Sequence, residues 1–261
     1  MTAAAQQTIQ TATSSFFVPV VLAWALMFVG LELGRRWLPR VWPCALASPS
    51  KRPWLDVGVA LLVAAAILGL GQLWHSGALD WQWPGRWRQL AFALAQALIW
   101  SPLPIALWLR RQTAASAWTG ADALLVRLCA GVVLGALAIT VFLAMRGELS
   151  RWGEIATKAL TLRSLAHALP VYLEGVGRAF LFVRLQWALG SLTAALVPAG
   201  LFALAHVPGS LAAGDTTGSI VGFFAFNLLF VAVLLRLLAR HRDVVTLGAA
   251  HWLMDLAIAA F

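Results

Sequence analysis

Charged residues are scarce in this chain of 261 residues. Only 11% of the residues are Asp, Glu, Lys or Arg, whereas 61% are hydrophobic. A chain with so few charges cannot surround a buried core with polar side chains, so the composition excludes a soluble globular protein. It predicts an all-α fold, a polytopic bundle of transmembrane helices.

Several further features are absent. The two cysteines, Cys44 and Cys129, show neither metal-ligand spacing nor a disulfide framework, and we expect both to be free thiols. No internal repeat or heptad pattern is present, which disfavours a transporter built from symmetric halves. No basic stretch precedes the first apolar run, so we expect this run to remain as a span and not to be a cleaved signal peptide.

The net charge of +9 comes mostly from arginines grouped between apolar runs. This grouping is typical of cytoplasmic loops and not of a nucleic-acid surface, and we expect no nucleic acid partner. It places 35–52, 110–111 and 236–242 on the cytoplasmic side, with both termini outside. The net positive segment 147–168 falls outside in this topology, which weighs against the assignment.

The apolar runs predict about eight spans of a hydrocarbon core about 30 Å thick. We expect them at 16–33, 54–74, 90–109, 124–145, 170–189, 193–207, 220–238 and 244–261. Ser101, Pro102 and Pro104 predict a kink or break in the third span.

Charges at helical spacing occupy 147–168 and predict an amphipathic helix on the membrane surface, or a gate over the spans that follow. We therefore divide the chain into three regions. The N-terminal region of four spans covers 1–146, the amphipathic connecting segment covers 147–168, and the C-terminal core covers 169–261.

Glu174 and Arg178 stand four residues apart inside an otherwise apolar run. This spacing places both side chains on one face of a helix. A charge inside a bilayer costs roughly 2.5 to 3.5 kcal/mol, so such residues need a reason to be there. Two interpretations stay open: the pair marks a functional site, or the charges only neutralise each other and hold the helix packing.

Two later runs carry polar residues at the same spacing. Phe202 precedes His206, and His251 precedes Asp255. Because each buried ionisable group needs a partner, we predict that Glu174, His206 and His251 share one polar cavity. These three are also possible zinc ligands, as in a metalloprotease, but the helical His-Glu-x-x-His motif is absent, and we expect no cofactor.

In their order, the three pairs resemble the CAAX-protease and bacteriocin-processing family of intramembrane endopeptidases, of the type II CAAX prenyl endopeptidase kind. Its usual pattern is Glu-Glu-x-x-x-Arg, then Phe-x-x-x-His, then His-x-x-x-Asn or Asp, and the likeness covers roughly the last 95 residues. The resemblance implies a bacterial inner membrane enzyme that acts on a membrane-anchored peptide or protein. It implies catalytic roles for Glu174, His206, His251 and Asp255, and supporting roles for Arg178 and Phe202.

The sequence departs from the family pattern at Leu173, where the family has the Glu credited with activating water. If the site is active, Glu174 takes a proton from water and His206 orients that water. His251, oriented by Asp255, then donates toward the developing oxyanion. The alternative is an inactive relative that binds peptides as a scaffold or immunity protein.

Overall fold

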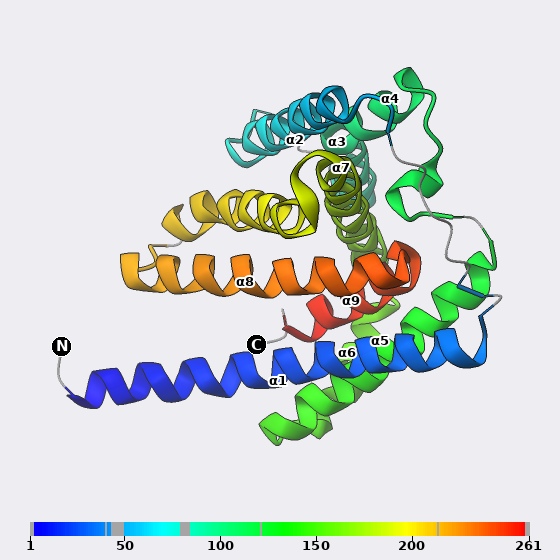
Figure 1. The fold of residues 1–261 in the computed structure, drawn as a ribbon. Helices are drawn as coiled ribbons and strands as arrows, with labels where there is room; N and C mark the ends of the chain where they lie inside the picture. Colours follow the sequence, from blue (N-terminus) through cyan, green and yellow to red (C-terminus); the bar gives the residue numbers. More distant parts are fainter. Residues whose placement is uncertain are drawn as a thin grey trace. The chain divides into compact units, whose positions relative to one another are not determined.

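The structure is a computed structural model that describes residues 3–39, 41–42, 50–78, 84–120, 122–212 and 214–258, with the backbone alone for 3–16 and for Arg86. Throughout these residues the secondary structure is helical and contains no strand, which confirms the all-α class (Figure 1). Cys129 is a free, exposed thiol as predicted, whereas Cys44 lies outside the described residues.

The helices follow one another along the chain with short connections. They are α1 (Ala3–Trp37), α2 (Pro53–His75), η1 (Gly85–Trp87), α3 (Arg88–Trp100), α4 (Pro102–Leu109), η2 (Ala114–Ala117), α5 (Leu124–Arg146), η3 (Leu149–Arg151), α6 (Trp152–Ala159), α7 (Leu162–Ala212), α8 (Thr217–His241) and α9 (Val244–Ile258). Among the described residues, five helices are long and apolar enough to cross a membrane, and α3 with α4 makes a sixth span if the bent pair counts as one.

Helix α7 contains two of the predicted spans. Its 51 residues would extend about 76 Å if straight, more than twice the thickness of the hydrocarbon core. The helix is broken at Gly190, whose φ of 76° and ψ of 166° suit a residue without a Cβ. Dividing α7 there and counting the shorter apolar helix α9 gives eight apolar segments, in agreement with the predicted number.

The predicted break in the third span is confirmed. Helices α3 and α4 meet at Ser101 and are bent by 42°. Pro102 begins α4, and the Ser101 hydroxyl donates to the carbonyl of Leu98, 2.8 Å away, at the end of α3. The bend therefore lies where prolines and a serine compete with the regular helical hydrogen bonds.

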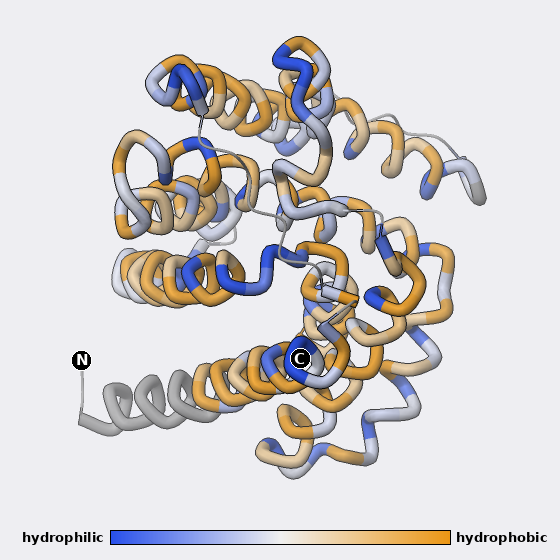
Figure 2. Tube along the Cα trace, turned by 45° about the vertical axis from the view of Figure 1, so that its right-hand side comes forward, coloured by the Kyte–Doolittle hydropathy of each residue, from blue (hydrophilic) through white to orange (hydrophobic). Residues whose placement is uncertain are grey.

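Large apolar side chains are exposed along the candidate spans, for example Leu62 in α2, Leu125 in α5 and Leu229 in α8. Figure 2 shows hydrophobic residues along most of the length of the helices, with hydrophilic residues mostly at turns and helix ends. Such exposed apolar surface on helices of spanning length faces lipid. The chain is an integral membrane protein.

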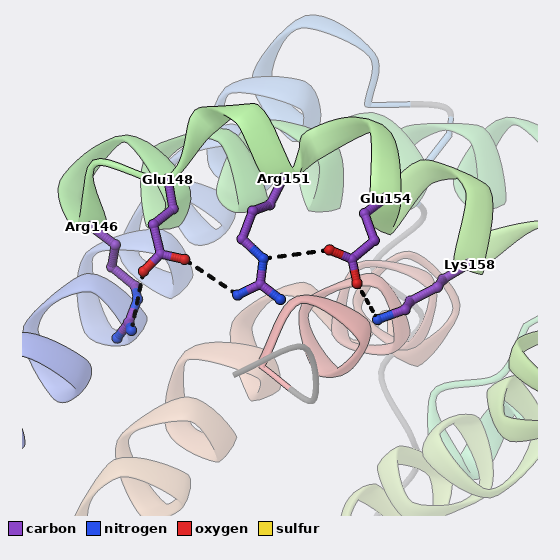
Figure 3. Close-up of polar contacts among 5 residues, drawn as sticks. All are labelled: Arg146, Glu148, Arg151, Glu154 and Lys158. Carbon is purple, nitrogen blue, oxygen red and sulfur yellow. Dashed lines mark hydrogen bonds and ion pairs between the residues drawn. The ribbon is translucent and has the colours of Figure 1, made fainter.

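The connecting segment between α5 and α7 carries a row of alternating charges (Figure 3). Along this row Arg146, Glu148, Arg151, Glu154 and Lys158 pair in succession, with N···O distances of 3.5, 3.3, 3.5 and 2.5 Å. The row runs from the last residue of α5 through η3 to α6. The helix ends at Ala159, and α7 begins at Leu162, so the last part of the predicted segment 147–168 already belongs to α7.

The chain forms two compact units. Unit 1 consists of Met1–Pro43, Asp122–Val171 and Val245–Phe261, and unit 2 consists of Cys44–Ala121 and Tyr172–Val244. Each unit thus combines segments that are distant in the sequence. The predicted regions 1–146, 147–168 and 169–261 divide the chain by function and not by compactness. This division stays a prediction.

In unit 1, helix α9 lies directly against the backbone of α5. A Cβ added to Gly131 would be only 2.3 Å from the carbonyl oxygen of Thr246, and one added to Gly135 would be 3.0 Å from the Cα of Ala250. On other sides of α9, the indole of Trp42 donates to the Thr246 hydroxyl (3.3 Å), and the indole of Trp252 donates to the carbonyl of Ser164 (2.8 Å). These contacts hold α9 along its length.

In unit 2, the first part of α7 is also packed through glycines. A Cβ on Gly177 would lie 2.6 Å from the ring of Trp100, and one on Gly175 would lie 3.0 Å from the side chain of Val244. After Gly190 the second part of α7 runs beside α8, where a Cβ on Gly200 would contact Leu228 at 3.7 Å (Figure 1).

Candidate functional site

Glu174 and Arg178 form the ion pair that their spacing predicts. Arg178 Nη2 lies 2.5 Å from Glu174 Oε1, and the two side chains are 14% and 27% exposed, respectively. The buried Oε1 nevertheless accepts no hydrogen bond of normal geometry from the described residues, so the contact is a charge–charge contact more than an aligned hydrogen bond. Arg178 supplies the counter-charge that a half-buried carboxylate needs.

Arg178 also connects the first pair to the second. Its guanidinium carbon lies 4.9 Å from the centroid of the Phe202 ring, and the ring of Phe202 lies 4.4 Å from that of His206. A guanidinium over an aromatic face is attracted by the ring quadrupole. Glu174, Arg178, Phe202 and His206 thus form one row in unit 2, which we call the glutamate row.

The backbone of α7 orients His206. Its Nδ1 lies 2.9 Å from the carbonyl oxygen of Phe202. Because a carbonyl oxygen only accepts, we infer that Nδ1 carries a proton, so that in the neutral ring Nε2 is the acceptor. Phe223 of α8 contacts the same imidazole at a ring distance of 6.0 Å, and His206 is exposed.

His251 and Asp255 lie on one face of α9 in unit 1. His251 Nε2 is 3.4 Å from Asp255 Oδ1, and their side chains are 17% and 32% exposed. This distance exceeds that of a good N–H···O hydrogen bond. The ring of Trp24, in α1, meets the imidazole edge to face at 5.3 Å and 64°. The same-face arrangement is as predicted, and the catalytic roles and the shared cavity with Glu174 and His206 stay predictions.

Helix α7 is regular where the sequence departs from the family pattern. Leu173 and Glu174 both lie in continuous α-helix, without a π-bulge that would turn Glu174 toward the direction of its neighbour. The close packing at Gly175 and Gly177 further limits rotation of this part of α7. Glu174 therefore keeps its own direction, about 100° around the helix from Leu173.

The possible metal ligands in the described part of each unit are not grouped as a metal site requires. Within either unit, the described residues include no three His, Cys, Asp or Glu side chains grouped to hold a metal ion. Glu174 and His206 by themselves supply two donors, whereas zinc sites in proteins use three or four protein ligands. Zinc, with Glu174, His206 and His251 as its possible ligands, stays an untested alternative.

Arg184 is a buried residue to which the sequence assigned no role. It is 4% exposed, and its guanidinium donates to Gln112 Oε1 (2.6 Å), to Ser116 Oγ (2.7 Å) and to the Ser116 carbonyl (2.8 Å). It thereby ties α7 to the segment around η2. A charge in an apolar run was a visible signal, but neutral partners about seventy positions earlier could not be identified from spacing.

A comparison with known families matches the segment that carries these residues. Residues 155–257 match the family described as Type II CAAX prenyl endopeptidase Rce1-like, and this match confirms the resemblance found in the sequence. No curated protein and no solved structure matches the chain. Over the segment that contains all the motif residues, the chain is similar to a family of CAAX-type membrane proteases, whereas residues 1–154 lie outside the match.

Proposed function

We propose that this membrane protein is an intramembrane endopeptidase that hydrolyses a peptide bond of a membrane-anchored peptide or protein. The observation that carries the proposal is the glutamate row, in which a carboxylate and an imidazole are linked through Arg178 and Phe202. A carboxylate and a neutral imidazole are the two groups that take protons from water near neutral pH. The family match over 155–257 supports the same class of reaction.

The proposed reaction is addition of water to the scissile carbonyl. Glu174 accepts a proton from a water molecule that His206 orients through Nε2, and the water oxygen bonds to the carbonyl carbon. The C–N bond then breaks, and the proton passes from Glu174 to the leaving nitrogen. His251, oriented by Asp255, is the proposed hydrogen-bond donor to the oxyanion.

The substrate side of the proposal follows from the setting of the site. The glutamate row is carried by a helix of an integral membrane protein, so a substrate anchored in the bilayer reaches it by lateral diffusion. A peptide ending in a prenylated Cys-aliphatic-aliphatic-X sequence is the substrate class that the family description names. We place the enzyme in a bacterial inner membrane, with the arginine-rich loops in the cytoplasm and both termini outside.

The second candidate is a catalytically inactive relative that binds peptides as a scaffold or immunity protein. The observation that favours it is Leu173, because the regular helix offers no local distortion by which Glu174 replaces the first Glu of the family pattern. In this case the charges of the row serve only packing and peptide binding.

One experiment separates these possibilities. Purified protein in lipid nanodiscs is mixed with a farnesylated peptide ending in Cys-aliphatic-aliphatic-X, with and without a strong zinc chelator, and an unprenylated peptide serves as the control. Cleavage that withstands the chelator supports the Glu174 mechanism, and cleavage lost with the chelator supports zinc. Binding without cleavage supports the inactive relative, and gain of cleavage in Leu173→Glu would identify the missing carboxylate as the cause.

A further inference from the structure

The proposed site includes a contact from a part of the chain that the family match does not cover. Trp24 belongs to α1, far from residues 155–257, yet its ring meets the imidazole of His251 at 5.3 Å. Trp24 is 8% exposed, so the contact is buried. Both residues belong to unit 1, and their contact is therefore internal to one compact unit.

The backbone of α9 is held independently of this contact. Gly131 and Gly135 of α5 let α9 approach the backbone of α5 closely. Trp42 donates a hydrogen bond to α9, and Trp252 donates one from α9 to Ser164. These contacts fix the position of the helix axis. They do not select the plane of the His251 ring, which depends on two side-chain torsions.

Asp255 is one contact that selects this plane, but the distance of 3.4 Å between its Oδ1 and His251 Nε2 is longer than that of a strong hydrogen bond. Trp24 adds a second contact of a different kind. An edge-to-face aromatic pair favours a particular angle between the two rings, here 64°. The indole also covers one side of the imidazole, which limits the ring positions that remain open.

We propose that Trp24 is a positioning residue for His251. Its indole sets the plane of the imidazole, so that His251 keeps one nitrogen toward Asp255 and presents the other to the oxyanion. The catalytic part of this inference rests on the proposed function. Its consequence is that α1 is a component of the active site, even though the family match does not include α1.

The first test compares three variants of the full-length protein. Trp24→Leu removes the aromatic face, and Trp24→Phe retains one. Phe182→Leu, the control, removes a buried ring that contacts Trp118. For cleavage of the farnesylated peptide, we expect kcat to fall about tenfold in Trp24→Leu with KM unchanged, and to stay within about threefold in Trp24→Phe. Phe182→Leu should lower the unfolding temperature comparably and leave kcat unchanged.

The second test does not depend on activity. In protein with ¹³C-labelled histidine, the His251 imidazole signal is assigned by its loss in His251→Gln. The ring current of Trp24 should displace this signal, so Trp24→Leu should move it, whereas Phe182→Leu should not.

The outcomes are distinguishable. An unmoved His251 signal in Trp24→Leu, or equal losses of kcat in the Leu and Phe variants, would overturn the positioning role. If the wild-type protein fails to cleave the peptide, the proposed function fails, while the histidine signal still decides whether Trp24 sets the ring of His251.

Discussion

The two parts of the proposed site are held in different ways. In unit 2, Glu174 and His206 are joined by side chains, because Arg178 pairs with the carboxylate and stacks on Phe202. In unit 1, His251 is placed mainly by its helix, which packs against glycines of α5. Substitutions that change charge or polarity should therefore affect the glutamate row most, whereas substitutions that change side-chain volume should affect the His251–Asp255 pair most.

The largest expected effect is on catalysis in the glutamate row. Glu174→Gln keeps the shape of the side chain and removes its basicity, so kcat should fall about 10²- to 10⁴-fold. His206→Ala should lower kcat by a factor in the same range. Glu174→Gln keeps an amide oxygen beside Arg178, so the unfolding temperature should fall less than in Arg178→Ala. The matched control is Glu32→Gln, which removes an exposed carboxylate paired with Arg36 and should leave cleavage intact. Wild-type rates in both Glu174→Gln and His206→Ala would disprove the mechanism.

The next effect tests the role of volume in unit 1. In Gly131→Ala the new methyl group would meet the backbone oxygen of Thr246 at 2.3 Å, and a backbone atom cannot move aside as a flexible side chain can. We expect a loss of about 3 kcal/mol in the free energy of unfolding. Gly58→Ala, which meets nothing within 4 Å, should instead stabilise α2 by about 0.5 to 1 kcal/mol. Denaturant unfolding in detergent measures both, and equal stability of the two variants would contradict the close packing of α9 on α5.

A smaller difference should separate the two charged pairs. Arg178→Ala leaves Glu174 without its counter-charge and should cost about 2 kcal/mol of unfolding free energy. Asp255→Asn breaks a longer and more exposed pair, so its cost should be about 1 kcal/mol or less. Because the family also carries Asn at this place, Asp255→Asn should retain cleavage. A greater loss of stability in Asp255→Asn than in Arg178→Ala would reverse the comparison.

The smallest expected effect lies outside both parts of the site, in the charged row on α6. The hydrogen bond and positive charge of Lys158 lower the pKa of Glu154 below its ordinary value of 4.5. Because the pKa of Glu154 is lower in the folded protein than in the unfolded chain, its carboxylate stabilises the fold at pH values above the unfolded-state pKa. This stabilisation is lost as the pH falls through the folded-state pKa.

The test is the unfolding temperature of wild type and Glu154→Gln between pH 7 and pH 3. Wild type should be slightly more stable near neutral pH, and the difference should shrink below about pH 4.5. Because Glu154 is exposed, the difference should also shrink at high salt. A difference that grows on acidification would contradict the assigned pairing with Lys158.

Features that depend on neighbours in the chain were predictable. The composition predicts a helical membrane protein, the prolines predict the bend at Ser101, and the four-residue spacing predicts the pairing of Glu174 with Arg178. Each of these follows from the geometry of a single helix. The start of α7 at Leu162 was less predictable, because Arg163, Ser164 and His167 resemble a polar connection, whereas the apolar residues between them can continue a helix.

The amino-acid sequence was therefore sufficient for the class of protein, for the number of apolar segments and for locating the ionisable residues within them. Only the tertiary structure decided that Arg178 reaches Phe202, that Trp24 covers His251 and that Arg184 bonds to Gln112. The physical reason lies in the apolar surroundings. A helix in lipid is hydrophobic on all sides, so its sequence lacks the polar stripe that would reveal which face meets which neighbour, and small residues and close packing make that choice.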